Sequence, residues 1–322
     1  MKKLLIVLIL SVSLASCYKD YITDFDHNGI YFPYQTDVRT FVVGEGMKIE
    51  VGVAFAGVRE NTRDRIVSFS IDNSLVTPGI LGLMKSGLSY IKAAVANVSV
   101  LTPLPSNYYI LSDNSKMVIK TGKYMGSVVL TIDSAKFVAD PKALIANYAI
   151  PFLLTGADAD TILKSKNSNV IGLIYENMLF GNYWHGGVTI VKDAAGTTLQ
   201  TIPYYTVVNQ PENMSWKLKT VGPNQLVTNG YSNTTTAKEE MLLTLDGTNI
   251  TVSTRTGSTF AVLPNGASTF NRAKLLQGRK ILLNYKYVNA AGNTCYATDT
   301  LTFRNRIRDG VNEWLDENPA NY

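Results

Sequence analysis

The chain is dominated by short segments in which apolar and polar residues alternate. In the clearest, 48–55, Ile49, Val51, Val53 and Phe55 fall on one face of the strand that the alternation predicts. Gly, Pro, Asn and Asp clusters separate further segments of this kind, at 65–71, 116–120, 127–132, 148–154 and 170–175. Successive short strands without alternating helices predict an antiparallel β-sandwich over residues 29–178. The apolar segment 81–98 is the exception, and we expect one helix inserted there.

A second series of strands begins at Gly181 and is punctuated by turn sequences such as Asp246-Gly247 and Asn265-Gly266. Consecutive strands joined by short turns predict an up-and-down meander, which removes its edges by closing into a barrel. We assign residues 179–322 to this barrel. We also expect a short helix over 309–316, with Trp314 packing against the fold.

The N-terminus carries a secretory signal. Lys2 and Lys3 precede an apolar run. This run is too short to cross a bilayer, because a membrane-spanning helix needs about 20 apolar residues. Leu14-Ala15-Ser16-Cys17 resembles the bacterial lipobox, which implies a signal peptide over 1–16 and diacylglycerol on Cys17. Residues 17–28 are polar and read as a tether. Their acidic residues resemble the signal that exports Bacteroidetes lipoproteins to the outer face of the outer membrane, so we expect a lipid-anchored protein facing the cell exterior.

Composition indicates a globular chain, with 46% hydrophobic and 17% charged residues. The formal net charge is +5, of which Lys2 and Lys3 leave with the signal peptide. This weak, scattered charge argues against a nucleic-acid partner. Arg304, Arg306 and Arg308 are spaced as on one face of a strand, which we interpret as a solvated face. With Cys17 lipidated, Cys295 has no disulfide partner and reads as a buried apolar residue.

Catalytic chemistry is poorly represented. The two histidines are His27, in the tether, and His185, and neither a nucleophile elbow nor Cys/His metal spacing nor a phosphate-binding glycine loop is present. We therefore expect no enzyme, no cofactor and no metal. A Ser-His-Asp site built on His185, and a carboxylate pair acting as a weak glycosidase, remain open alternatives.

Aromatic content is the more suggestive feature, with 18 tyrosines and 3 tryptophans. Sugar rings stack their apolar faces on aromatic side chains, and tyrosine adds a polar tip. The candidate glycan-binding residues are concentrated in the second domain: Tyr183, Trp184, Tyr204, Tyr205 and Trp216. Ordinary barrel packing is the alternative for each of them.

Several short motifs resemble a known family. These motifs are Gly29-Ile-Tyr-Phe, Val43-Gly-Glu-Gly46, Leu104-Pro-Ser-Asn-Tyr-Tyr109 and Gly126-Ser-Val-Val-Leu-Thr-Ile132. They are similar to an uncharacterised, Ig-like N-terminal domain of Bacteroidetes surface lipoproteins, which precedes a family-18 glycosidase domain or a lipocalin-like domain. Gly181-Asn-Tyr-Trp184 and Thr302-Phe-Arg-Asn-Arg306 resemble the lipocalin-like version. The Asp-x-x-Asp-x-Asp-x-Glu signature of the glycosidase is missing from the sequence.

The resemblance implies an all-β protein with an Ig-like β-sandwich followed by a lipocalin-like barrel. It also implies a non-catalytic accessory of a polysaccharide utilisation system, which binds an oligosaccharide or glycan beside an outer-membrane importer. Two alternatives remain: a fimbrial or adhesin-like subunit that assembles by strand exchange, and a lipocalin-like binder of a small apolar ligand.

Three Asp-Ser/Thr-apolar triplets resemble the periplasmic O-glycosylation signal of Bacteroidetes. Their acceptors are Ser134, Thr161 and Thr300. The first two follow predicted strands in polar loops, where a glycan can be accommodated, whereas Thr300 lies inside a predicted strand. We therefore expect modification at Ser134 or Thr161 before Thr300.

Overall fold

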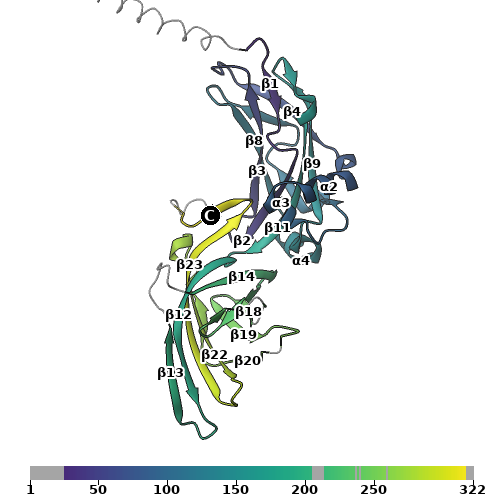
Figure 1. The fold of residues 1–322 in the computed structure, drawn as a ribbon. Coiled ribbons are helices and arrows are strands. Elements are labelled where there is room, and N and C mark those ends of the chain that lie inside the picture. Colours follow the sequence, from purple (N-terminus) through teal and green to yellow (C-terminus); the bar gives the residue numbers. More distant parts are fainter. Residues whose placement is uncertain (1–24, 205–213, 236–237, 239–240, 259, 317–322) are drawn as a thin grey trace, which may run out of the picture.

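A computed structural model describes residues 25–204, 214–235, 238, 241–258 and 260–316. The chain forms two β domains arranged end to end (Figure 1). The strands of the first lie between Gly29 and Asn177, and those of the second begin at Gly181, on either side of the predicted boundary. The all-β prediction is thus confirmed.

The first domain is a sandwich of two sheets. One has the order β10-β1-β3-β8-β6, with bounds Thr161–Ile162, Gly29–Tyr31, Lys48–Ala56, Met125–Ile132 and Tyr109–Leu111. The other has the order β2-β11-β9-β4-β7, with bounds Thr36–Val43, Ser168–Asn177, Tyr148–Ala157, Arg65–Ile71 and Lys116–Ile119. A short β5 (Thr102–Pro103) joins this second sheet beside β9.

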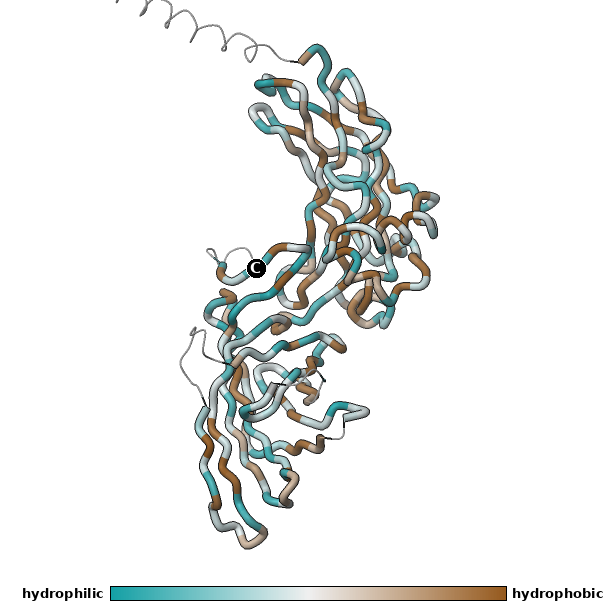
Figure 2. The backbone as a smooth tube through the Cα atoms, in the orientation of Figure 1, coloured by the Kyte–Doolittle hydropathy of each residue, from teal (hydrophilic) through white to brown (hydrophobic). Residues whose placement is uncertain are grey.

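The alternation predicted for 48–55 is present in β3, where Ile49, Val51, Val53 and Phe55 are buried between the sheets. Figure 2 shows the same alternation of hydrophobic and hydrophilic residues along strands of both domains. Not every pair is antiparallel, because β2 pairs with β11 in parallel from Thr36 to Val43.

The segment 81–98 forms two helices instead of the one that we expected. These are α2 (Pro78–Ser86) and α3 (Ser89–Ala94). Gly87 ends α2 with an extended backbone, so the chain turns before α3 begins. Both helices pack on the outer face of the second sheet through Met84 and Ile91. The other short helices within the described residues are α4 (Ser134–Ala139) and the 3₁₀ turns Asn73–Leu75, Ser106–Tyr108, Pro141–Leu144, Lys164–Lys166 and Leu276–Gly278.

The second domain is built on one long sheet. Its order is β13-β12-β14-β15-β18-β19-β21-β22-β23-β24, with bounds Thr198–Tyr204, Gly181–Lys192, Met214–Gly222, Gln225–Thr228, Met241–Asp246, Asn249–Thr254, Ser268–Phe270, Lys280–Val288, Thr294–Arg308 and Val311–Glu313. β20 (Val262–Pro264) pairs with β22, and β16 (Gly230–Tyr231) pairs with β17 (Thr234–Thr235). Because β12 also pairs with β23 along Asn182–Lys192, the sheet closes on itself as an antiparallel barrel.

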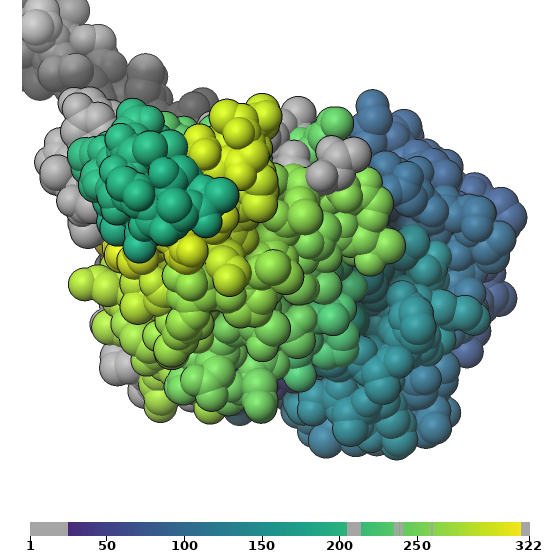
Figure 3. All heavy atoms as spheres, turned by 90° about the horizontal axis from the view of Figure 1, so that it is seen from below, coloured from purple at the N-terminus to yellow at the C-terminus, as the bar shows by residue number. Residues whose placement is uncertain are grey.

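Side chains fill the barrel interior. Large rings such as Tyr183, Trp216 and Tyr285 are fully buried there, packed with leucine, valine and methionine from the other strands. The coloured atoms of the barrel face seen from below show no open mouth (Figure 3). Within the described residues, the interior therefore offers little space for the small apolar ligand of the lipocalin-like alternative.

The predicted C-terminal helix is wrong. Asp309 and Gly310 have φ values of 53° and 80°, which reverse the chain directly after β23. The next residues then pair with β23 as β24, and Glu313 binds two arginines of that strand. Trp314 does not pack on the fold as expected, because 65% of its surface is exposed.

Candidate functional site

Two of the predicted glycan-binding rings lie inside the barrel. Tyr183 and Trp216 occupy inward positions of β12 and β14 and are fully buried. Tyr183 donates a hydrogen bond to the carbonyl of Leu179 at 3.1 Å, and the indole of Trp216 donates to the carbonyl of Thr234 at 3.1 Å. Both are core residues, so neither ring can stack on a ligand outside the barrel.

The other predicted rings differ in their environments. Trp184 points outward, is partly exposed, and holds the guanidinium of Arg304 over its ring at 4.4 Å. Tyr204 is partly buried and bonds inward to Asp299, while Tyr205 lies outside the described residues. The structure therefore does not bring the four described residues together, and among these four only Trp184 presents an outward ring.

A buried polar cluster lies inside the barrel around Asp299. The hydroxyls of Tyr204 and Tyr285 donate to its two carboxyl oxygens, the second at 2.5 Å. Nε2 of His185 lies 3.2 Å from Asp299 Oδ1, and the imidazole ring stacks on Trp216 at 3.9 Å. Burial, together with the nearby Asp299, raises the pKa of both tyrosines, so they remain neutral donors at physiological pH.

This cluster does not form the Ser-His-Asp relay that the sequence left open. Although His185 is near Asp299, its N–H is not aligned for a hydrogen bond, and neither ring nitrogen has a hydrogen-bond partner. The hydroxyl of Ser232 instead bonds Thr189 at 2.5 Å. With His185 and Asp299 fully buried as well, the cluster fits a packing role better than nucleophilic attack.

A cleft of 430 Å³ lies where the two domains meet. The first domain contributes Tyr90 and Glu176, and the barrel contributes Phe180, Asn182 and Lys217 to its lining. Oε2 of Glu176 is buried without a hydrogen-bond partner. Burial raises the pKa of Glu176 to about 7, against the opposing effects of Thr220, Lys217 and Lys219. The cleft thus offers hydrogen-bonding groups and a ring in one concave site.

A second cleft, of 510 Å³, lies on the other side of the turn after β23 and shares Thr40 and Asp309 with the first. Thr40 donates to Asp309 at 2.8 Å. Burial raises the pKa of Asp309 to about 6, although Thr40 and the guanidinium groups of Arg39 and Arg308 lower it.

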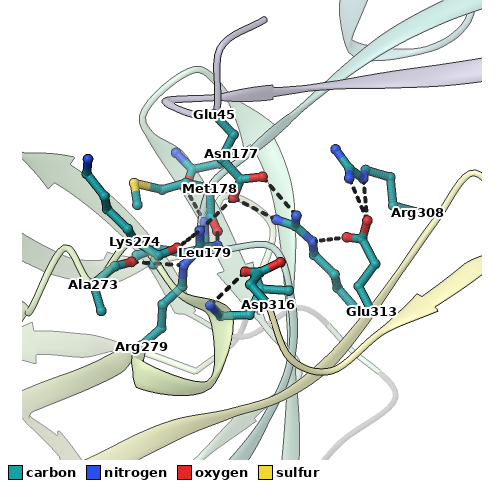
Figure 4. A network of polar contacts seen from close by, with 12 residues as sticks. Glu45, Asn177, Met178, Leu179, Ala273, Lys274, Arg279, Arg308, Glu313 and Asp316 are labelled. Atoms are coloured by element: carbon teal, nitrogen blue, oxygen red, sulfur yellow. Dashed lines mark hydrogen bonds and ion pairs between the residues drawn. The ribbon is translucent and has the colours of Figure 1, made fainter. Parts of the chain in front are cut away.

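An ionic clamp formed by Glu45, Arg279, Arg306 and Glu313 joins the first domain to the barrel, and Glu313 also lines the 510 Å³ cleft (Figure 4). Glu45 lies in the turn between β2 and β3 and accepts from Arg279 at 2.6 Å and from Arg306 at 2.8 and 2.9 Å. Burial alone would raise the pKa of Glu45, but the hydrogen bonds and charge of Arg306 and Arg279 hold it below its usual value. Arg304, Arg306 and Arg308 thus do not form the one solvated face that the sequence predicted, because Arg306 is fully buried in the clamp.

The predicted O-glycosylation acceptors are all exposed. Ser134 begins α4 after the N-cap Asp133, and Thr161 lies in the short β10. Thr300 also faces solvent, but the Asp299 that precedes it is buried in the barrel cluster. The lipidation candidate Cys17 lies outside the described residues, and Cys295 is a buried free thiol.

Two structural features are missing from the described residues. They contain no group of three or more His, Cys, Asp or Glu side chains placed to hold a metal ion. No helix among them is long and apolar enough to cross a membrane.

Sequence reasoning missed the residues that organise these sites. Asp299 occupies an inward position between the buried Ala297 and Leu301, so a polar residue in an apolar alternation could have identified it. Glu45 carried no such signal, since a glycine-flanked turn usually faces water. Its partners are more than 230 residues away in the sequence.

Comparison with known proteins supports the fold. A family model described as an N-terminal domain matches residues 25–161. A protein of unknown function from Bacteroides ovatus, solved at 2.40 Å resolution, is 20% identical, with a TM-score of 0.63 over 91% of this chain and 99% of that chain. A second protein of unknown function from the same organism is 11% identical, with a TM-score of 0.43 over 91% of this chain and 100% of that chain.

No curated protein sequence matches the chain. The likeness to the first Bacteroides ovatus protein shows that the two-domain fold is shared, while the family match lies within the first domain and ends before β11. The first domain is thus similar to a family of N-terminal domains, in agreement with the resemblance that its sequence motifs indicated.

Proposed function

We propose that this protein is a cell-surface lipoprotein that binds a glycan without cleaving it. The observation that carries the proposal is the 430 Å³ cleft between the domains, with Trp184 beside it. Trp184 lies one outward position along β12 from Asn182, which lines the cleft. A partly exposed ring next to amide, hydroxyl and ammonium groups suits a sugar, which presents an apolar face and a rim of hydroxyls.

The test is binding of the mature chain to a broad glycan panel, by affinity electrophoresis and calorimetry. For a glycan that binds, Trp184→Ala is expected to weaken affinity about tenfold, because the stacking face is lost. Trp314→Ala is the matched control, since this exposed ring lines neither cleft and its loss should leave affinity unchanged. Failure to bind any glycan, or equal effects of the two variants, would overturn the proposal.

The anchoring part of the proposal rests on the lipobox. Acylated Cys17 inserts into outer-membrane lipid, and the protein faces the cell exterior beside components of a glycan importer. Intact-mass measurement of the native protein should show a diacylglycerol adduct that Cys17→Ser abolishes. Protease added to whole cells should digest the protein, and resistance to it would contradict surface exposure.

Glycosylation of the chain itself is a separate proposal. Ser134 and Thr161 are exposed on the first domain. Asp299, the first residue of the triplet at Thr300, is buried in the barrel, so a glycosylating enzyme cannot contact that whole triplet. Peptide mass spectrometry of protein from its native host should find a glycan at Ser134 or Thr161 before Thr300. A mass without any glycan would reject the proposal.

A further inference from the structure

The outer face of the barrel has a charge distribution that extends beyond the proposed cleft, to which it contributes Lys217. It is built from β12, β13, β14, β22 and β23, on which Asp299 is the single acidic residue. Asp299 points into the barrel and is fully buried. The outward positions of these strands therefore carry basic, hydroxyl, amide and apolar side chains without any carboxylate.

The strand registers place the basic residues on one surface. Trp184 of β12 lies opposite Thr302 of β23, which lies opposite Lys280 of β22. Three rows further along the same strands, Ile190 lies opposite Tyr296, which lies opposite Lys286. Directly opposite residues share a face of the sheet. We call this surface the basic wall, formed by Lys192, Lys217, Lys280, Lys286 and Arg304.

The positive charge of the basic wall is not neutralised within the described part of the chain. None of its five members forms an ion pair there, and two of them instead lie over outward rings. Arg304 covers Trp184 at 4.4 Å, and Lys192 covers Tyr296 at 5.4 Å. A surface of one sign with uncompensated charge attracts an oppositely charged ligand over long range.

We propose that the basic wall binds an anionic polysaccharide, one whose sugars carry carboxylate or sulfate groups. The proposal rests on the proposed glycan-binding function and names its ligand class. Lys280 and Lys286 are six residues apart on β22, which corresponds to about 20 Å along a strand. That span suits several sugar units better than a single one, with the cations meeting acidic groups and the rings meeting sugar faces.

The location of the basic wall favours a polysaccharide over the headgroups of the anchoring membrane. β1, which follows the tether, lies at the end of the first domain remote from the barrel, whereas β13, β22 and the start of β23 lie at the opposite end of the molecule (Figure 1). For a chain anchored through Cys17, the basic wall is therefore held away from its own membrane.

The test uses the mature chain and polymers that differ only in charge. Dextran sulfate is compared with dextran, and polygalacturonate with its methyl ester, by affinity electrophoresis and calorimetry. The anionic member of each pair should bind more tightly, and raising the salt from about 50 to about 500 mM should weaken that binding. Equal binding of charged and neutral members would overturn the proposal.

Two triple variants with the same change in net charge locate the binding. Lys192→Gln/Lys280→Gln/Lys286→Gln alters the basic wall and should lower affinity for the anionic polymers about tenfold. Lys116→Gln/Lys123→Gln/Lys164→Gln alters exposed lysines of the first domain and should change it less than about twofold. Equal losses would show attraction by net charge alone and overturn the assignment to the basic wall.

Two further measurements separate the alternatives. Neutral glycans that bind beside Trp184 should bind the basic-wall variant with unchanged affinity. Glycan binding at the cleft can therefore be confirmed even if the proposal for the basic wall is overturned. Co-sedimentation with vesicles containing anionic phospholipid tests a membrane ligand. Binding to vesicles but not to the soluble anionic polymers would assign the surface to lipid and overturn the proposal.

Discussion

The ionic clamp between the domains and the polar cluster inside the barrel both bury a carboxyl group, but they satisfy it differently. Glu45 receives two guanidinium groups, and Arg306 in turn binds Glu313, so charge is matched by charge. Asp299 receives two tyrosine hydroxyls and the edge of an imidazole ring, within a shell of aromatic side chains.

The difference follows from where each carboxyl lies. The clamp joins two separately formed surfaces, and directional ion pairs fix how those surfaces meet. The barrel cluster lies within one sheet, where the strands already fix the geometry and neutral donors are enough. Removing one partner should therefore cost more in the clamp, because charged groups would remain buried without a counterion.

The largest effect is expected for Glu45→Ala. It leaves Arg279 and Arg306 buried without their shared carboxylate, which should lower the free energy of unfolding by about 3 to 5 kcal/mol. Urea denaturation measures the change. Glu50→Ala, at an exposed position of β3, is the control and should cost no more than about 0.5 kcal/mol. Similar losses of unfolding free energy in the two variants would show that the ion pairs of the clamp do not stabilise the fold.

Asp299→Ala should come next, with a loss of about 2 to 4 kcal/mol. It leaves the hydroxyls of Tyr204 and Tyr285 without their acceptor inside the barrel. Asp246→Ala, at an exposed hairpin end, is the matched control. If Asp299→Ala proved more damaging than Glu45→Ala, the proposed difference between charged and neutral partners would be wrong.

Glu176 extends the comparison to a carboxyl with one buried oxygen lacking any donor. Its pKa of about 7 in the folded protein exceeds the ordinary value of 4.5, so the folded state binds the proton more tightly than the unfolded state. This contribution to stability is fully present below pH 4.5 and is lost as the pH rises through 7.

Glu176→Gln removes this titration. The variant should gain about 3 kcal/mol over the parent protein at pH 8, with the gain vanishing toward pH 4.5, as measured by urea denaturation at both values. The exposed Glu60→Gln should show no such pH-dependent gain. A gain for Glu176→Gln that is equal at both pH values would contradict titration of this carboxyl.

The smallest effect is expected for Tyr204→Phe. The change removes one donor to Asp299 but leaves the Tyr285 hydroxyl in place, so the cost should be about 1 kcal/mol. Thermal unfolding beside Tyr34→Phe, an exposed ring of the first domain, gives the reference. A loss as large as that of Asp299→Ala would mean that the cluster acts as one cooperative unit.

Periodicity predicted most of the fold, because a half-buried strand needs apolar residues at every second position, as in β3 and β23. It failed at the C-terminus, where the positive φ values of Asp309 and Gly310 override the apolar spacing after them. The candidate site was predicted less well. Tyr183 and Trp184 are adjacent in sequence, and only the closed barrel decides which ring faces inward. The partners of Glu45 are determined by how the two domains dock, and the local pattern of apolar and polar residues carries no information about that docking.

The ionic clamp also constrains the order in which the chain can mature. Glu45 emerges from the ribosome 234 residues before Arg279 and 261 residues before Arg306. During synthesis the first domain can close its own core while Glu45 still faces water. The last long strand then brings Arg306, and the contact that aligns the domains forms among the final steps of folding. Damage to β23 would therefore leave the first domain foldable but unable to dock.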